Sequence, residues 1–460
     1  MAVLVETTTP VTEVVARFAC GEEFKEARDV VLERATRAVI DTVGVAVAAR
    51  QEPSFTILAR TVGGATATGD ATVLPTRTRM SAAQAALLNG TAGHALDFDD
   101  VADDLKGHPS VVLVSALLAV AETNASSGRE FLEAYAIGFE VACAIARGLP
   151  VEAHYRTGWH STATVGILAA AAAAGRLLHL DDARMRNALG IAASMASGSR
   201  QNFGTMTKPL HAGLAARDAV IAAQLAANGF TADQRQLEGP AGYFQIYGVD
   251  PDPREVLNAL AHPRALVEHG LNVKKYACCY ETHRAADAAL TMYGRGMRGN
   301  AVRSVTVSVQ PGGSQAVIHH RPETGLEGKF SAEYVVAACL LDGRLSLFSF
   351  TDDAVGRQDA QDLLRRVVVQ EVASPPFGPG GFEHAYATVE VTLTDGSTVR
   401  ERCDVPRGDA RAPLADAELE AKFRECLAFA DSDWDAEPLL CGLRGLPAAA
   451  RVTDAFSQLG

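Results

Sequence analysis

The chain lacks the patterns that mark metal-binding, redox and disulfide-rich proteins. Its 8 cysteines form no CxxC pair and no cluster with histidines. Cys278 and Cys279 are adjacent, which suits neither an ordinary disulfide nor a tetrahedral metal site. No HExxH motif is present either. The sequence therefore predicts a protein without bound metal in a reducing, cytoplasmic environment.

The patterns of secreted, nucleic-acid-binding and membrane proteins are also missing. Met1–Pro10 has no basic region followed by an apolar core, so no signal peptide is expected. The formal net charge is −13, and no stripe of lysine and arginine offsets it, which argues against a nucleic-acid partner. Ala163–Leu178 is apolar, but it is rich in alanine and glycine and Arg176 interrupts it. We therefore expect a soluble protein without a membrane partner, with this segment as a buried helix.

The length and the hydrophobic pattern predict two domains. At 460 residues the chain exceeds what one hydrophobic core usually supports. From Val11 to about Arg264, apolar residues recur at three- and four-residue spacing, and several segments are apolar on nearly all faces. These segments predict helices buried within a large bundle, over 24–49, 81–95, 111–124, 129–149, 163–179, 183–197, 212–228 and 254–260.

After about residue 268 the pattern changes to strands mixed with helices. Val302–Gln310 alternates from Ser304 onward and predicts a strand. Thr388–Arg400 contains two alternating runs around Thr394–Ser397, which predicts a hairpin. Helical patterns occur at 332–341, 358–367 and, in the tail, 414–428, while 375–381 is a Pro- and Gly-rich surface loop. A smaller α+β domain is therefore expected over 268–404.

An unusual acidic segment follows the helix predicted over 81–95. Asp97, Asp99 and Asp100 lie where the negative end of the helix dipole disfavours carboxylates. A solvated acidic loop, or a cap for the next helix, is one interpretation. His108 and Ser110 then precede an apolar helix, where a histidine could orient a substrate carboxylate against free backbone N–H groups. This pairing favours a functional interpretation.

Two further segments place a histidine or a lysine at the start of a helix. His160 precedes Ser161 and Thr162, which could simply be helix caps, but a histidine there can act as acid or base near neutral pH. Lys208 precedes a proline at a predicted helix N-terminus, where a cation is unfavourable unless an anionic ligand relieves it. An ordinary surface lysine is the alternative.

The last candidate segment, Val273–His283, lies at the predicted domain junction, where clefts commonly form. Lys274 or Lys275 could clamp a carboxylate, or both could be solvated. His283 begins or caps a helix predicted over 284–293. Cys279 has no evident partner for a covalent mechanism. Together the segments fit removal of a proton alpha to a carboxylate, with lysines and helix ends stabilising the charge that forms.

These segments resemble the MmgE/PrpD family. The matching stretches are HALDFDD with GHPS, GWHSTATVG, NFGTMTKPLHAG and KKYACCYETH, in the same order between about residues 10 and 400. The resemblance implies a mainly α fold, with a large all-helical domain of residues 1–267 and 405–460 and a smaller α+β lid domain of 268–404. It further implies a homodimer, no metal or organic cofactor, and a small polycarboxylate substrate bound in a pocket at the domain interface.

The resemblance also suggests roles for individual residues. Asp97 or His160 would be the base, His108 the acid or an orienting group, and Lys208 with Lys274 the carboxylate clamp. Ser110, Thr162 and His283 complete the predicted substrate-binding set.

The family includes 2-methylcitrate dehydratase, iminodisuccinate epimerase and cis-aconitate decarboxylase. Val101 and Cys279 stand where the decarboxylase type has a threonine and a histidine. We therefore expect a cofactor-independent lyase or isomerase, dehydratase-like or epimerase-like, with decarboxylation disfavoured. A non-catalytic anion-binding protein is the competing class.

Overall fold

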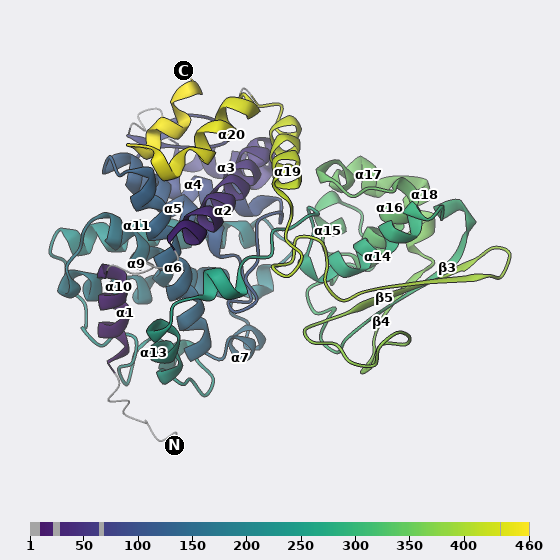
Figure 1. Ribbon diagram of the computed structural model, residues 1–460, viewed down its shortest axis with the longest axis horizontal. Coiled ribbons are helices and arrows are strands. Elements are labelled where there is room, and N and C mark those ends of the chain that lie inside the picture. The colour runs from purple at the N-terminus through teal and green to yellow at the C-terminus, as the bar shows by residue number, and fades with distance from the viewer. Residues whose placement is uncertain (1–9, 22–27, 64–68, 433, 460) are drawn as a thin grey trace. The chain divides into compact units, whose positions relative to one another are not determined.

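The computed structural model describes residues 10–21, 28–63, 69–432 and 434–459, and these form two compact units (Figure 1). The first unit holds the described residues up to Asn202, then Met206–Asn272 and those from Ala417 onward. The second unit holds Phe203–Thr205 and Val273–Asp416. The prediction of a mainly α protein is confirmed, and the larger of its two sheets is a small mixed sheet in the second unit.

The first unit is a helical bundle (Figure 1). Its helices are α1 (Val11–Cys20), α2 (Arg28–Ala48), α3 (Pro53–Val62), α4 (Ala82–Ala95), α5 (Pro109–Thr123), α6 (Gly128–Gly148), α7 (Val151–Arg156), α8 (Ser161–Thr164), α9 (Gly166–Leu177), α10 (Asp182–Met195), α11 (Thr207–Ala227), α12 (Tyr243–Tyr247), α13 (Arg254–Ala261), α19 (Asp416–Phe429) and α20 (Ala436–Arg444). A short antiparallel pair, β1 (Ala71–Thr72) and β2 (Arg79–Met80), is the strand pair of this unit among the described residues.

Helix α5 shows why the bundle forms. Every residue from Pro109 to Glu122 is buried, because the segment is apolar all round and must be covered on every side. Helices α4, α6, α9 and α11 pack around it. Pro109 at the first helical position suits the start of the helix, since a proline there loses no hydrogen bond.

Two helix predictions in this unit need correction. The helix expected over 163–179 is divided into α8 and α9 around Val165. The helix expected from residue 212 begins at Thr207, so Lys208 lies inside its first turn. Residues 24–27 of another predicted helix lie outside the described residues. Among the helices that the structure describes, none combines the length and the apolar character needed to cross a bilayer.

The second unit contains a four-stranded sheet in the order β4-β3-β5-β6. The strands are β3 (Val302–Val309), β4 (Val367–Glu371), β5 (Ala387–Leu393) and β6 (Thr398–Cys403). The pair β3–β4 is parallel, and β3–β5 and β5–β6 are antiparallel. The predicted hairpin is confirmed as β5–β6, with Gly396 in the left-handed region at φ 87°.

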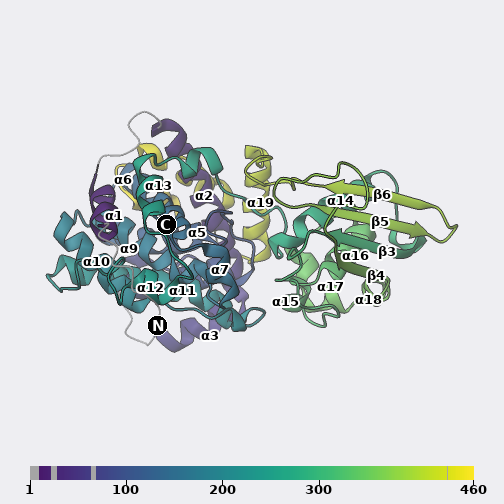
Figure 2. The same cartoon turned by 90° about the horizontal axis from the view of Figure 1, so that it is seen from below.

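Helices α14 (His283–Gly294) and α16 (Ala332–Asp342) pack along one face of this sheet, as Figure 2 shows. The shorter helices are α15 (Gly325–Gly328), α17 (Asp352–Gly356) and α18 (Gln358–Leu364). The helix expected over 358–367 therefore ends early, and β4 begins at Val367 instead. The β-branched run Val367–Val369 explains the change, because such residues favour strands.

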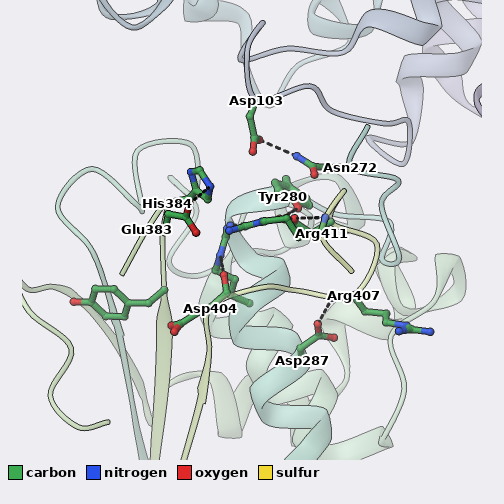
Figure 3. A network of polar contacts seen from close by, with 12 residues as sticks. Asp103, Asn272, Tyr280, Asp287, Glu383, His384, Asp404, Arg407 and Arg411 are labelled. Carbon is green, nitrogen blue, oxygen red and sulfur yellow. Dashed lines mark hydrogen bonds and ion pairs between the residues drawn. The ribbon is translucent and has the colours of Figure 1, made fainter. Parts of the chain in front are cut away.

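A polar network around the buried Asp409, which we call the Asp409 network, joins segments of the second unit; Tyr280 and Arg411 are labelled in Figure 3. Asp409 accepts hydrogen bonds from the Tyr280 hydroxyl at 3.0 Å and from the Arg411 guanidinium at 2.8 and 2.9 Å. The Arg284 guanidinium lies 3.9 Å from the same carboxylate. Burial alone would raise the pKa of Asp409, but its bonds to Arg411 hold that pKa below the ordinary value.

Candidate functional site

The close packing of α4 against α11 brings polar residues of four segments together. A Cβ atom on Gly90 of α4 would lie only 2.8 Å from the Cα atom of Gly213 on α11. Glycine at both positions therefore lets the two backbones touch. As a result, His94 near the end of α4 lies close enough to Lys208, in the first turn of α11, for the lysine charge to lower the pKa of the histidine.

The loop from Leu96 to His108 connects α4 to α5 and carries the acidic residues. Asp97 adopts a left-handed backbone with φ 51°, which costs about 1 kcal/mol for a residue with a side chain. Its carboxylate pairs with the Lys208 ammonium. Further along, Val101 pairs with Asn272 through two backbone hydrogen bonds of 2.9 Å. His108 then precedes α5 as its N-terminal flanking residue.

Asp99 lies between two histidines. Its carboxylate lies 2.8 Å from His94 Nδ1 and 3.2 Å from His108 Nδ1. Burial would raise the pKa of Asp99, but the charges of His108 and His94 and the hydrogen bond from His94 hold it well below the ordinary value. Burial, together with Lys208, lowers the pKa of His94 to about 3 although Asp99 opposes this. The neutral His94 therefore carries its proton on Nδ1 and donates a hydrogen bond to the ionised Asp99.

A second histidine pair lies beside this group. The His160 and His211 Nδ1 atoms are 3.2 Å apart, and one of them must donate while the other accepts. The His160 ring stacks on His94 with centroids 5.7 Å apart. Burial and the charges of His94 and Lys208 lower the pKa of His160, and burial and Lys208 lower that of His211. Both rings are therefore neutral near pH 7.

We call His94, Asp99, His108, His160 and His211 the histidine cluster. With Asp97 and Lys208 beside it, the cluster holds groups that can accept and donate protons next to a fixed cation. Such an arrangement can transfer a proton at a carbon whose neighbouring carboxylate is held by the ammonium.

Several expectations from the sequence can be compared with these positions. The solvated acidic loop is wrong, because Asp97, Asp99 and Asp100 are all buried. The surface-lysine alternative for Lys208 is wrong as well, since only 6% of it is exposed. The anion expected to offset its charge at the helix N-terminus is Asp97 of the same chain.

The two predicted binding hydroxyls have protein partners. Ser110 Oγ bonds to the Asp100 carboxylate and to the Tyr135 hydroxyl. Thr162 Oγ1 accepts a 3.0 Å hydrogen bond from the backbone N–H of His108. Burial and the nearby Asp41 raise the pKa of Asp100 to about 8. These contacts tie the loop to α5, α6 and α8.

Lys274 and His283, the other two predicted site residues, belong to the second unit. Lys274 is almost completely buried, with 1% exposed. His283 is the first residue of α14, as expected, and its ring lies 5.1 Å from those of Tyr276 and Tyr280. Cys279 packs with Val317, Phe330 and Ala332 in a small apolar cluster. Their role in a substrate site stays a prediction.

Sequence reasoning did not single out His94, Asp99 or His211 as site residues. His94 could have been found from its place one helical turn before Asp97, and His211 from its place three residues after Lys208. The structure also brings one ligand atom each from His94, Asp99 and His108 within 4.8 Å of one another. Two imidazoles and a carboxylate form a donor set that suits a divalent transition metal. No spacing in the sequence had indicated this group.

Comparisons with known proteins agree with the resemblance of the four segments. The MmgE/PrpD N-terminal domain matches residues 13–256 and the MmgE/PrpD C-terminal domain matches residues 276–437. Cis-aconitate decarboxylase from Homo sapiens is 30% identical over 425 residues, which cover 90% of this chain and 87% of the relative. The Mus musculus enzyme is 29% identical, covering 90% and 86%, and that of Aspergillus terreus is 26% identical, covering 86% and 84%. This chain therefore belongs to the MmgE/PrpD family.

Proposed function

We propose that the chain is a lyase that decarboxylates a small unsaturated polycarboxylate of the cis-aconitate type. The relatives named above are cis-aconitate decarboxylases, and their similarity to this chain extends over most of their length. These relatives favour decarboxylation over dehydration or epimerisation. The sequence alone had ranked the reactions the other way, because Val101 and Cys279 depart from the decarboxylase pattern. The observation that carries the proposal is the buried histidine cluster beside the Asp97–Lys208 pair.

The reaction needs a proton donor to carbon. In cis-aconitate, breaking the bond between the CH2 carbon and its carboxylate releases CO2. The electron pair of that bond forms a new double bond to the central carbon, and the pair of the old double bond moves to the third carbon. That carbon takes one proton and becomes a CH2 group beside a carboxylate. The enzyme must therefore hold the remaining carboxylates and deliver one proton to one carbon atom.

The residues of the first unit fit these two tasks. The Lys208 ammonium, in the first turn of α11, can hold a carboxylate where the helix N-terminus also favours anions. His108 or His160 can deliver the proton. The carboxylate of Asp99 stabilises the positive charge that His108 carries when it holds the proton. Lys274 is the proposed second clamp, and a homodimer is the proposed assembly.

Substrate binding should itself favour protonation of His160. Burial and Lys208 keep His160 neutral in the free protein. A bound polyanion adds negative charge beside the imidazole, which raises its pKa and favours the protonated form. Binding of a non-reacting tricarboxylate is therefore expected to take up protons from the buffer. Calorimetry in buffers of different ionisation enthalpy measures this uptake, and uptake that persists in His160→Gln would contradict the assignment.

A second candidate reaction is dehydration or epimerisation. Val101 and Cys279 are the observation that favours it, because these residues depart from the decarboxylase pattern. Both reactions begin with removal of a proton alpha to a carboxylate, a step for which a neutral imidazole is suited. The same cluster therefore serves either reaction, and the products decide.

NMR in deuterated water separates these possibilities. With cis-aconitate, decarboxylation predicts loss of CO2, new terminal-methylene signals and one deuterium in the product. Solvent deuterium in recovered acids without CO2 would favour an epimerase, and loss or addition of water would favour a dehydratase. Saturable binding without turnover of any polycarboxylate would contradict the enzyme and support the anion-binding alternative.

A further inference from the structure

The loop that carries Asp97 and Asp99 is held by a helix distant in the sequence, α19 of the same unit. Lys422 Nζ donates a 2.8 Å hydrogen bond to the carbonyl oxygen of Phe98, the residue between the two aspartates. The ammonium also lies 3.9 Å from the centroid of the Phe98 ring. Lys422 follows Phe98 by 324 positions in the sequence and is only 6% exposed.

A buried lysine is costly, so its surroundings need an explanation. Asp41 of α2 lies 2.6 Å from Lys422 Nζ and neutralises its charge. Neutralisation alone does not require a lysine, because an apolar pair of similar volume is often as stable as a buried ion pair. The bond to the Phe98 carbonyl is the contact that an apolar pair cannot replace.

Helix α19 packs against α2 near Asp41, where a glycine makes room for it. A Cβ atom on Gly44, one turn after Asp41, would lie 2.8 Å from Phe423 Cδ2. Glycine therefore leaves the room in which Phe423 packs, and Phe423 is 1% exposed. Because Phe423 is adjacent to Lys422, the packing of Phe423 against Gly44 also places the Lys422 ammonium beside the loop.

The backbone at this point needs such an anchor. Asp97 lies in the left-handed region, and the residues on either side of Phe98 face different partners. Asp97 pairs with Lys208, whereas Asp99 lies between His94 and His108. Rotation of the peptide that follows Phe98 would move the Asp99 carboxylate away from both histidines, and Lys422 opposes that rotation by holding its carbonyl oxygen.

We propose that Lys422 is a positioning residue for the site, which acts through the Phe98 carbonyl to hold Asp99 against His94 and His108. Its effect on turnover rests on the proposed decarboxylase function, but its effect on the histidines does not. Helix α19 thereby helps to hold the site in place without touching the substrate.

The test uses two matched pairs of substitutions in the full chain. Asp41→Val/Lys422→Met removes the buried charges together with the hydrogen-bond donor to Phe98. Asp41→Val/Lys422→Gln removes the same charges but keeps an N–H donor of similar side-chain length to methionine. Arg424→Met, two residues further along α19, is the control, because Arg424 is partly exposed and pairs with Glu420 and Glu437.

Two readouts are compared. Nitrogen-15 NMR of the histidines reports the Nδ1 contacts of His94 and His108 with Asp99 without any substrate. We expect shifted signals in the methionine pair, partial recovery in the glutamine pair and wild-type signals in Arg424→Met. With cis-aconitate, kcat should fall by about 10²-fold in the methionine pair with little change in KM, as for a small misplacement of a catalytic group.

The outcomes separate this proposal from the proposed function. A folded methionine pair with wild-type histidine signals and wild-type kcat would overturn it, since Lys422 would then only neutralise Asp41. If the wild type turns over no polycarboxylate but the signals still shift, the proposed function fails and the positioning role stands. Should the methionine pair not fold, Asp41→Ala/Lys422→Leu removes the same donor with different packing and is read in the same way.

Discussion

The two units each bury a cluster of charged and polar side chains, and the clusters differ in how completely their atoms are paired. In the second unit, Asp409 accepts bonds from Tyr280 and Arg411 and lies near Arg284. The bonds satisfy both carboxylate oxygens, and the nearby guanidinium groups offset the charge of the carboxylate. Such a network costs little to bury and joins distant segments of the chain.

The histidine cluster of the first unit is paired less completely. Among the residues that the structure describes, His94 Nε2 and Asp99 Oδ1 are buried without a hydrogen bond. Burial and Lys208 lower the pKa values of His94 and His160, so these rings are held in their neutral form at a cost. The difference indicates that the Asp409 network serves the fold, whereas the histidine cluster retains capacity for a ligand and a proton.

The largest expected effect concerns His160. His160→Gln should lower kcat by about 10²- to 10⁴-fold, the usual contribution of a positioned acid or base. His154→Gln is the matched control, because His154 is buried too but bonds to the Tyr247 carbonyl at 2.8 Å and to Thr164 Oγ1 at 2.7 Å. It should lose stability and keep its kcat. Steady-state kinetics with cis-aconitate measure both, and equal losses of kcat in the two variants would contradict the comparison.

The next prediction compares the same substitution, aspartate to asparagine, at one position in each unit. Asp99→Asn should lower kcat by about 10²-fold, because the amide cannot stabilise a protonated His108. Asp409→Asn should leave kcat near wild type and lower the free energy of unfolding by about 2–3 kcal/mol, since it weakens charged hydrogen bonds. Kinetics and calorimetry on both variants test this. A catalytic loss in Asp409→Asn, or a purely thermal loss in Asp99→Asn, would erase the distinction.

The sequence predicted most of the elements, because their patterns are local. The apolar run after Pro109 predicts α5, and the alternation around Gly396 predicts the β5–β6 hairpin. Strand β4 was missed because Val367 follows a helical pattern without a turn signal between them. Local pattern thus predicts the type of an element better than the point at which it ends.

The site was predictable in its segments and not in its pairings. Lys208 and Asp97 were both singled out, but only the left-handed backbone at Asp97 decides that they pair while Asp99 faces the histidines. Spacing along the chain does not indicate a contact such as that of Lys422 with Phe98, which depends on how α19 docks. Tertiary packing determines which of these residues pair, and the pattern of a single sequence does not reveal that packing.

A smaller effect is expected from pH. The pKa of His94 is lowered to about 3 in the folded protein, against about 6.5 when unfolded. Its contribution to stability is therefore complete above pH 6.5 and is lost as the pH falls towards 3, because the unfolded chain then binds the extra proton. Between pH 6.5 and 5 the wild type should lose about 2 kcal/mol more than His94→Gln.

Tryptophan fluorescence in urea measures this difference, since both tryptophans of the chain, Trp159 and Trp434, belong to the first unit. Asp100, with its pKa raised to about 8, changes stability in the opposite sense, but it does so in both proteins. Parallel pH curves for wild type and variant would mean that His94 is not held neutral by burial. The Asp409 network should contribute no slope in this range, because its lowered carboxylate pKa places its loss at lower pH.

The smallest expected effect is that of a chelator. His94, Asp99 and His108 offer a donor set for a divalent ion, but His94 Nδ1 lies 2.8 Å from Asp99 as a hydrogen-bond donor, and it must lose that proton to bind metal. The charge of Lys208, which already lowers the pKa of His94, also opposes a second cation. We therefore expect kcat to be unchanged after dialysis against EDTA and after addition of Zn²⁺ or Mn²⁺. If chelation lowered kcat, and a metal restored it in the wild type but not in Asp99→Asn, these three residues would be a metal centre. The contrast with the Asp409 network would then reflect metal binding rather than a capacity for proton transfer.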